Sequence, residues 1–210
     1  MKKVLLSAAA LLIASLSFGQ AKWGIVAGPN FSSITAKNFT TNGKETSKLI
    51  TGVRAGVTVD IPLAEEFFIG TGLLYAGKGG KDKDNTDFKT TLSYLQLPVN
   101  FMFKPEVGSG NMVLAVGPYF AYGVGGKYKG KIGSVNFDTN VFDDGVMKLK
   151  RFDAGAGIQI GYEMLTGLYF GLNADLGLVN NLDDTKSNNG DRSFKNTSFG
   201  VSLGYKFGGK

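Results

Sequence analysis

The sequence contains neither cysteine nor histidine, and these two absences exclude whole classes of chemistry. Without cysteine the chain can form no disulfide and can carry no lipid on a thiol. Without either residue it has no Cys- or His-based metal site, no cysteine nucleophile and no histidine general base. Carboxylate-only mechanisms survive this filter, but we expect neither an enzyme nor a bound cofactor.

Proline is also scarce, at five residues, whereas glycine and aromatic residues are abundant. Glycine contributes 31 of the 210 residues, about twice the usual share, and it follows no collagen triplet. Phenylalanine and tyrosine contribute 16 and 8 residues. This composition argues against a disordered chain and favours an all-β architecture.

The first 19 residues have the features of a secretory signal peptide. A basic start precedes an apolar stretch over residues 4–16, and the small residues Ser17 and Gly19 allow cleavage directly afterwards. We expect residues 1–19 to be removed and residues 20–210 to form one domain. Because the chain has no cysteine, it cannot carry a lipoprotein anchor.

Beyond residue 22 the chain alternates apolar and polar residues in eight segments. They lie near residues 23–31, 51–61, 67–76, 91–103, 112–124, 151–163, 168–178 and 197–207. In the fourth segment Leu95, Leu97 and Val99 fall on one face, and Gln96 and Asn100 fall on the other. A period of two over this length predicts strands. The uncharged stretch between the charges at 106 and 127 is long enough for a membrane helix, but its many glycines make it a poor helix former.

Glycine lies on only one face of these segments. All fifteen glycines within them fall on the polar parity. A water-exposed face gains nothing from glycine, which weakens a strand, whereas a narrow lumen needs the space that glycine leaves for larger side chains. If the polar face lines a lumen, the apolar face meets lipid, as in a membrane β-barrel. A soluble lipocalin-like barrel with its apolar face inward is the alternative.

The connections between segments alternate between long and short. Long polar stretches at residues 32–50, 77–90, 125–150 and 179–196 are separated by short ones at 62–66, 104–111 and 164–167. Outer-membrane barrels have an even number of strands, short periplasmic turns and longer outer loops. Aromatic residues gather near both ends of the segments, as expected at the headgroup layers. We therefore predict an all-β, eight-stranded antiparallel up-and-down transmembrane barrel in the bacterial outer membrane, with both termini in the periplasm.

Several motifs resemble the small outer-membrane β-barrel family of Bacteroidetes-type bacteria, often described as porin-like. They are the runs Gly24–Ser32, Leu73–Gly79, Tyr94–Val99, Gly117–Tyr119 and Asp153–Gly157. The resemblance covers residues 22–207 and implies an outer-membrane location, but the family has no single activity to carry over. The last segment is similar to the signal read by the barrel-insertion machinery, with Ser198, Gly200, Leu203 and Tyr205 at its polar, glycine, apolar and aromatic positions.

The inward parity carries polar and charged residues that we expect to form a network inside the lumen. The candidate network consists of Arg54, Asp60, Gln96, Arg151, Asp153, Glu163, Asp175 and Lys206. An eight-stranded barrel is narrow enough for side chains to fill, and buried charges need partners of opposite sign. Asp60, Glu163 and Lys206 fall at one height, and Arg54 and Asp175 fall near mid-height. A paired network plugs the lumen and predicts a structural or interaction role, whereas an unpaired one predicts a small porin-like channel for ions or small solutes.

The long loops are the second candidate functional surface. Their charges sum to +5, which favours contact with outer-membrane lipid and with the phosphates of lipopolysaccharide. The basic residues are scattered over separate loops, so we expect no nucleic-acid binding, and the sequence names no extracellular ligand. The carboxylate pairs Asp143–Asp144 and Asp183–Asp184 are the best candidates for a cation site, but adjacent Asp residues in polar loops are typical of solvated turns.

Overall fold

The computed structural model describes six stretches of the chain. They are residues 21–37, 43–83, 87–132, 135–142, 149–182 and 192–208. The predicted signal peptide and both carboxylate pairs of the long loops lie outside these residues. Within the described residues every regular element is a strand, and no helix long and apolar enough to cross a membrane occurs there.

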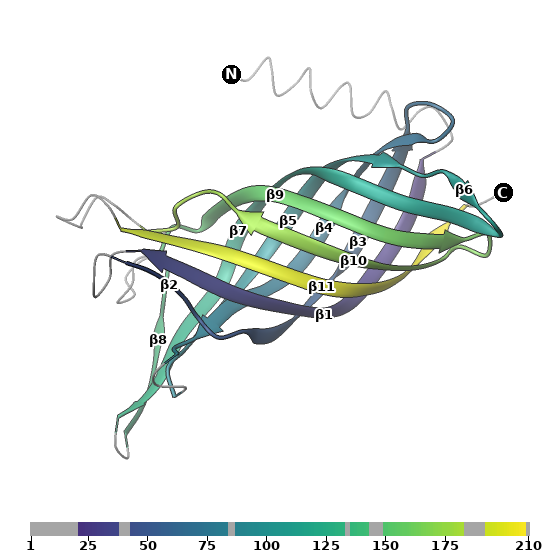
Figure 1. Ribbon diagram of the computed structural model, residues 1–210. Coiled ribbons are helices and arrows are strands. Elements are labelled where there is room, and N and C mark those ends of the chain that lie inside the picture. The colour runs from purple at the N-terminus through teal and green to yellow at the C-terminus, as the bar shows by residue number, and fades with distance from the viewer. Residues whose placement is uncertain are drawn as a thin grey trace.

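Eight long strands form one closed antiparallel barrel (Figure 1). They are β1 (Lys22–Lys37), β3 (Ile50–Pro62), β4 (Phe67–Lys81), β5 (Lys89–Phe103), β7 (Gly110–Ile132), β9 (Phe152–Met164), β10 (Leu168–Gly177) and β11 (Ser193–Phe207). Each pairs with its neighbour in the chain, and β11 closes the barrel on β1 in a register that runs from Trp23 opposite Phe207 to Lys37 opposite Ser193. The predicted eight-stranded up-and-down barrel is confirmed.

Three short strands extend this barrel locally. They are β2 (Lys44–Thr46), which pairs with β1, β6 (Glu106–Val107), which pairs with the start of β7, and β8 (Val135–Asn140), which pairs with the end of β7. The turns at residues 63–66 and 165–167, the connection that holds β6 and the ends of the chain at β1 and β11 share one end of the barrel. We call this the short-turn end and the opposite one the long-loop end.

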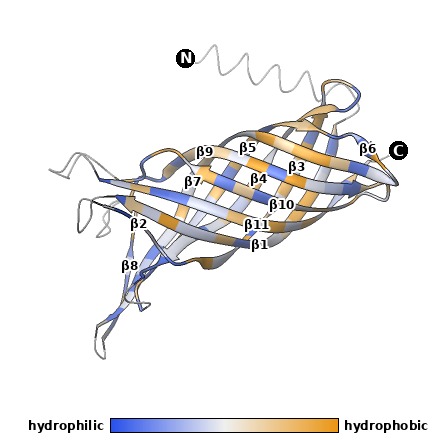
Figure 2. Ribbon diagram, in the orientation of Figure 1, coloured by the Kyte–Doolittle hydropathy of each residue, from blue (hydrophilic) through white to orange (hydrophobic). Residues whose placement is uncertain are grey.

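The apolar parity of the strands faces outward. Large apolar side chains such as Val57, Leu97, Ile158 and Leu203 are exposed, and hydrophobic and polar positions alternate along the barrel wall in Figure 2. Aromatic rings stack on this outer face near both ends. Ring centroids of Phe67 and Phe103 are 5.1 Å apart at the short-turn end, and those of Phe31 and Phe199 are 5.4 Å apart toward the other end. The same face therefore carries an apolar belt between two aromatic girdles, as lipid contact requires.

The strands extend further at the long-loop end than the alternation predicts. Strand β4 continues to Lys81 instead of residue 76, and β7 continues to Ile132 instead of residue 124. The outer face of both extensions carries lysines in place of apolar side chains, so the apolar alternation ends while the backbone ladder continues. A bulge accompanies the change, because Tyr94 pairs with Gly123 and Ser93 with Gly125, which leaves Val124 as an extra residue on β7.

Candidate functional site in the barrel lumen

The lumen holds eight buried charged side chains, which are the buried charged residues within the part of the chain that the structure describes. The cations are Arg54, Lys78, Lys104 and Lys206, and the anions are Asp60, Asp153, Glu163 and Asp175. They come from inward-facing positions of β3, β4, β9, β10 and β11 and from the residue directly after β5. Four positive charges face four negative ones, and they are grouped in three tiers along the barrel axis.

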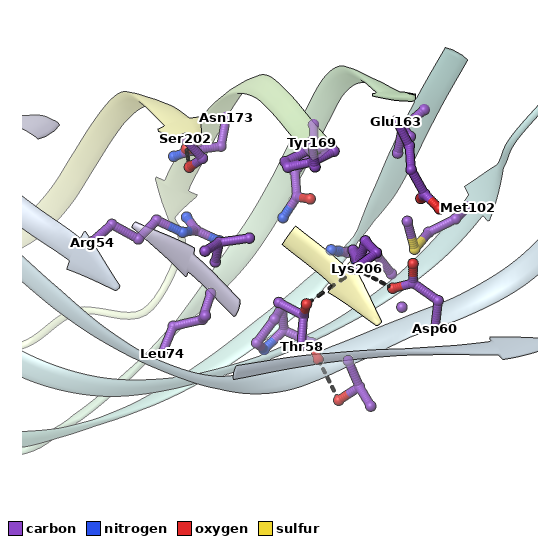
Figure 3. Close-up of a pocket in the computed structure, with 17 residues that line it drawn as sticks. Arg54, Thr58, Asp60, Leu74, Met102, Glu163, Tyr169, Asn173, Ser202 and Lys206 are labelled. Atoms are coloured by element: carbon purple, nitrogen blue, oxygen red, sulfur yellow. Dashed lines mark hydrogen bonds and ion pairs between the residues drawn. The ribbon is translucent and has the colours of Figure 1, made fainter. Parts of the chain in front are cut away.

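The tier at the short-turn end joins four charged side chains from different strands. Lys206 Nζ lies 2.7 Å from Asp60 Oδ1 and also donates a hydrogen bond to the Thr58 hydroxyl at 3.1 Å (Figure 3). Lys104 Nζ lies 3.1 Å from Asp60 Oδ2 and donates a second hydrogen bond to Glu163. Both carboxylates are therefore neutralised by ammonium groups, which buried charges require.

The middle tier is built around Asp175 of β10. Arg54 Nη1 donates to Asp175 Oδ2 at 2.9 Å, and Gln96 Nε2 donates to the same oxygen at 2.9 Å. Nearby, the Ser202 hydroxyl donates to Asn173 Oδ1 at 3.1 Å. Strands β1 and β11 lie between β3 and β10 in the barrel order, so the Arg54–Asp175 bridge crosses the bore rather than following its wall.

The tier toward the long-loop end pairs Lys78 of β4 with Asp153 of β9. Lys78 Nζ lies 3.4 Å from Asp153 Oδ2, and it also lies 4.2 Å from the centroid of the Tyr119 ring. Asn196 Nδ2 donates to the same carboxylate at 3.3 Å, and Tyr94 accepts a hydrogen bond from Asn181 at 3.2 Å. Aromatic faces and amide groups thus surround the ion pair.

An apolar cluster lies at the long-loop end of the lumen, next to the tier of Lys78 and Asp153. Val141, Phe142 and Leu149 are buried against Leu92, Phe194 and other inward-facing residues of the wall. The backbone of Leu149 donates to the Val141 carbonyl at 2.8 Å, which holds the two arms of this loop together. Part of the connection between β8 and β9 is therefore folded back into the barrel mouth. We call Val141, Phe142 and Leu149 the plug.

Glycines on the inner face make room for the large side chains. A Cβ atom at Gly161 would lie 2.7 Å from Tyr169 Cε2, and one at Gly171 would overlap the hydroxyl of the same tyrosine. Likewise, a Cβ atom at Gly155 would lie 2.8 Å from the ring of Tyr119. The polar-face glycines therefore include positions that leave space for inward aromatic rings, as the parity argument predicts.

A small cavity of about 40 Å³ lies between the tier at the short-turn end and the middle tier (Figure 3). Its lining includes Arg54, Thr58, Asp60, Met102, Tyr169 and Lys206. This volume is enough for a few water molecules.

Most of the residues predicted for the lumen are buried where the parity places them. Arg54, Gln96 and Asp175 meet in one tier, and Asp60, Glu163 and Lys206 belong to another. Arg151 lies outside the three tiers. It precedes β9, donates to the Gly123 carbonyl at 2.8 Å and places its guanidinium 5.1 Å from the Phe142 ring. Asp153 is bridged by Lys78.

Two lumen cations are missing from the predicted network, because both fall in predicted connections. Lys78 falls in a predicted loop, although it continues the inward parity of Leu74 and Ala76 along the extended β4. Lys104 falls in a predicted turn, although it follows Met102 with the same parity. If the alternation of inward and outward residues is continued past the predicted ends of β4 and β5, Lys78 and Lys104 both fall on the inward face.

The predicted insertion signal lies on β11, where alternate residues face the lumen and the outside of the barrel. Ser198 is buried in the lumen and Gly200 is on the same parity, whereas Leu203 and Tyr205 are exposed on the outer face. Tyr205 packs against Phe207, with their ring centroids 5.2 Å apart. The outer face of the last strand is therefore apolar near the short-turn end.

A closed antiparallel barrel with an apolar outer belt and a charge-filled lumen defines the class of integral membrane β-barrels. Residues 18–184 match the family model described as outer membrane protein beta-barrel domain. Since this match covers well over half of the sequence, the chain belongs to that family, whose location is the bacterial outer membrane. No curated protein sequence matches the chain.

Solved outer-membrane proteins are similar to this chain over most of its length at low identity. Ail, the attachment invasion locus protein of Yersinia pestis, is 11% identical over 89% of this chain and 99% of that one, with a TM-score of 0.45. Neisserial surface protein A is 6% identical over 87% and 97%, with a TM-score of 0.44. A major outer membrane protein from Thermus thermophilus is 13% identical over 90% and 100%, with a TM-score of 0.44. The family assignment rests on the family model alone.

Proposed function

We propose that this protein is a non-conducting outer-membrane barrel that acts through its outer loops and outer face. The observation that carries the proposal is that the ion pairs join strands that are not neighbours. Lys78 of β4 meets Asp153 of β9 and Arg54 of β3 meets Asp175 of β10, so the bridges span the bore at successive heights. The plug then seals the mouth with apolar side chains.

Paired charges favour a closed lumen over a watery one. Removing one partner of a buried pair leaves a desolvated charge, at a cost of about 3–5 kcal/mol. Opening the bore would require several such pairs to separate together, along with movement of the plug. A structural or interaction role is therefore favoured over transport, and the small channel for ions or solutes is the alternative.

The proposal includes an orientation and partners. The long-loop end faces the outside, and the short turns and both termini face the periplasm, as the loop-length asymmetry of outer-membrane barrels suggests. Residues 1–19 act as a cleaved signal peptide, and the segment from Ser198 to Tyr205 is the part of β11 that the insertion machinery reads. Outer-membrane lipid and lipopolysaccharide surround the barrel.

The release of a small solute from vesicles tests the proposal. The mature chain is reconstituted into lipid vesicles loaded with a fluorescent dye of low molecular mass, and an established larger porin serves as the positive control. We expect release at the rate of protein-free vesicles. Release in proportion to the amount of folded barrel would contradict the closed-lumen proposal and favour the channel.

A further inference from the structure

Lysines form a row across adjacent strands at the long-loop end. Lys48 pairs with Lys81, Lys81 with Lys89 on β5, and Lys89 with Lys129 on β7. The row ends at Asp138 of β8, which is opposite Lys129. Directly opposed residues in an antiparallel ladder point to the same face, so the four lysines lie side by side. We call this row the lysine ladder.

The ladder lies on the outer face of the barrel wall. Along β5, Lys89 has the parity of the lipid-facing Leu95 and Leu97. Along β7, the bulge at Val124 shifts the parity, so that Lys127, Lys129 and Lys131 join the outer face, where all three are exposed.

Electrostatic repulsion among these lysines is unfavourable unless an anion lies next to them. Like charges directly opposite each other destabilise a sheet, and here two successive strand pairs and one isolated bridge carry them. Asp138 offsets part of the charge, because its carboxylate lies 3.1 Å from Lys127 Nζ and 3.4 Å from Lys129 Nζ. This carboxylate lies beyond the end of the row, on the side of Lys129. A multiply charged anionic ligand over the ladder would relieve the repulsion among the other lysines.

The geometry of the β7–β8 hairpin turns the outer face at Lys129, one end of the ladder, toward the lipid. In Figure 1 the end of β7 and strand β8 leave the barrel wall and lean away from its long axis. A ribbon that bends outward turns its outer face toward the membrane surface. Lys89 lies six residues beyond Leu95, which is about 20 Å along the strand, and Tyr75 and Tyr122 flank Leu95 in the register. The outer face thus changes from apolar, through aromatic, to cationic in one direction.

We propose that the lysine ladder binds the phosphate groups of anionic lipid headgroups in the outer leaflet. The occupant is a membrane lipid, because the ladder continues the outward-facing side of β4, β5 and β7. Basic residues next to a membrane surface attract anionic headgroups, and long lysine side chains reach toward the interface while their stems lie along apolar surface. The inference rests on the proposed orientation of the barrel, with the long-loop end outside.

Binding of a phosphorylated lipid to the purified mature chain tests this assignment. Native mass spectrometry in detergent measures the affinity for bisphosphorylated lipid A and for the same lipid after its phosphates are removed. The test variant combines Lys81→Gln, Lys89→Gln and Lys129→Gln. The control combines Lys37→Gln, Lys150→Gln and Lys195→Gln, which removes the same charge from the long-loop end at lysines that do not lie opposite one another.

We expect the unmodified chain to prefer the bisphosphorylated lipid, and the ladder variant to bind it at least tenfold more weakly, while the control loses less than twofold. Equal loss in both variants, or no preference for phosphates, would overturn the proposal. Inositol hexakisphosphate without acyl chains is the second probe, and binding as tight as that of the lipid would assign the ladder to soluble anions instead.

Loss of lipid binding is distinguished from loss of folding and from conduction through the lumen. Each variant is first checked for a heat-dependent shift in gel mobility, which reports the closed barrel, and Lys89→Gln alone replaces the triple variant if that shift is lost. The single variant is expected to bind about two- to fivefold more weakly than the unmodified chain, and unchanged binding would contradict the ladder. A conducting barrel would refute the closed lumen without altering this binding measurement.

Discussion

Among single residues, the buried charges of the lumen stabilise the barrel only as pairs. Arg54→Ala leaves the Asp175 carboxylate buried with the neutral Gln96 amide as its hydrogen-bond donor, and we expect the free energy of unfolding to fall by about 3–5 kcal/mol. Replacing Arg54 with Met and Asp175 with Leu together is expected to cost much less, because no charge is then stranded. Denaturant unfolding in lipid vesicles measures both.

A double-mutant cycle gives the decisive comparison for this pair. A double variant that loses as much stability as the single variants Arg54→Met and Asp175→Leu combined would mean that Arg54 and Asp175 are not energetic partners. The pairing itself follows from sequence parity, since both positions fall on the inward face near mid-height. The partnership of Lys78 with Asp153 does not follow so simply, because Lys78 lies where the apolar alternation of β4 has already ended.

At the scale of the strands, we expect every second residue, the outward-facing one, to contact lipid. Val57, Leu97 and Ile158 are about half exposed on the outer belt. Changing any of them to Arg is expected to lower the stability of the barrel in lipid by about 2–4 kcal/mol. The same change at Asn136 or Thr139 of β8, beyond the apolar belt, is expected to leave folding nearly unchanged. Equal tolerance at both sets would contradict the assignment of the faces.

The electrostatic contribution of Asp138 to the stability of the β7–β8 hairpin depends on pH. A hydrogen bond from Lys127, together with the charges of Lys127 and Lys129, holds the pKa of Asp138 below its ordinary value of 3.8. The contacts therefore favour the hairpin above the ordinary pKa, and this contribution is lost as the pH falls through the lowered one. A carboxyl titration followed by NMR is expected to show the lowered pKa, and Lys127→Gln to move it back upward. An unchanged pKa in that variant would contradict the contact.

The extent of the elements marks the limit of prediction from sequence. Alternation predicts a strand only where one face is apolar, so it locates all eight barrel strands and ends β1, β4 and β7 too early. The plug is a different case. Phe142 and Leu149 lie in a stretch whose apolar residues do not alternate with polar ones, and only their tertiary packing with Leu92 and Phe194 shows that the loop turns into the lumen.

For the whole molecule, the central claim is that paired charges and the plug close the lumen. Its most direct test is single-channel recording of the unmodified mature chain in a planar bilayer, with insertion verified by the heat-dependent gel shift of the same preparation. We expect no stable conductance at any insertion density. Reproducible ion-selective current steps, each of the same size, would contradict it and would make this protein a small channel.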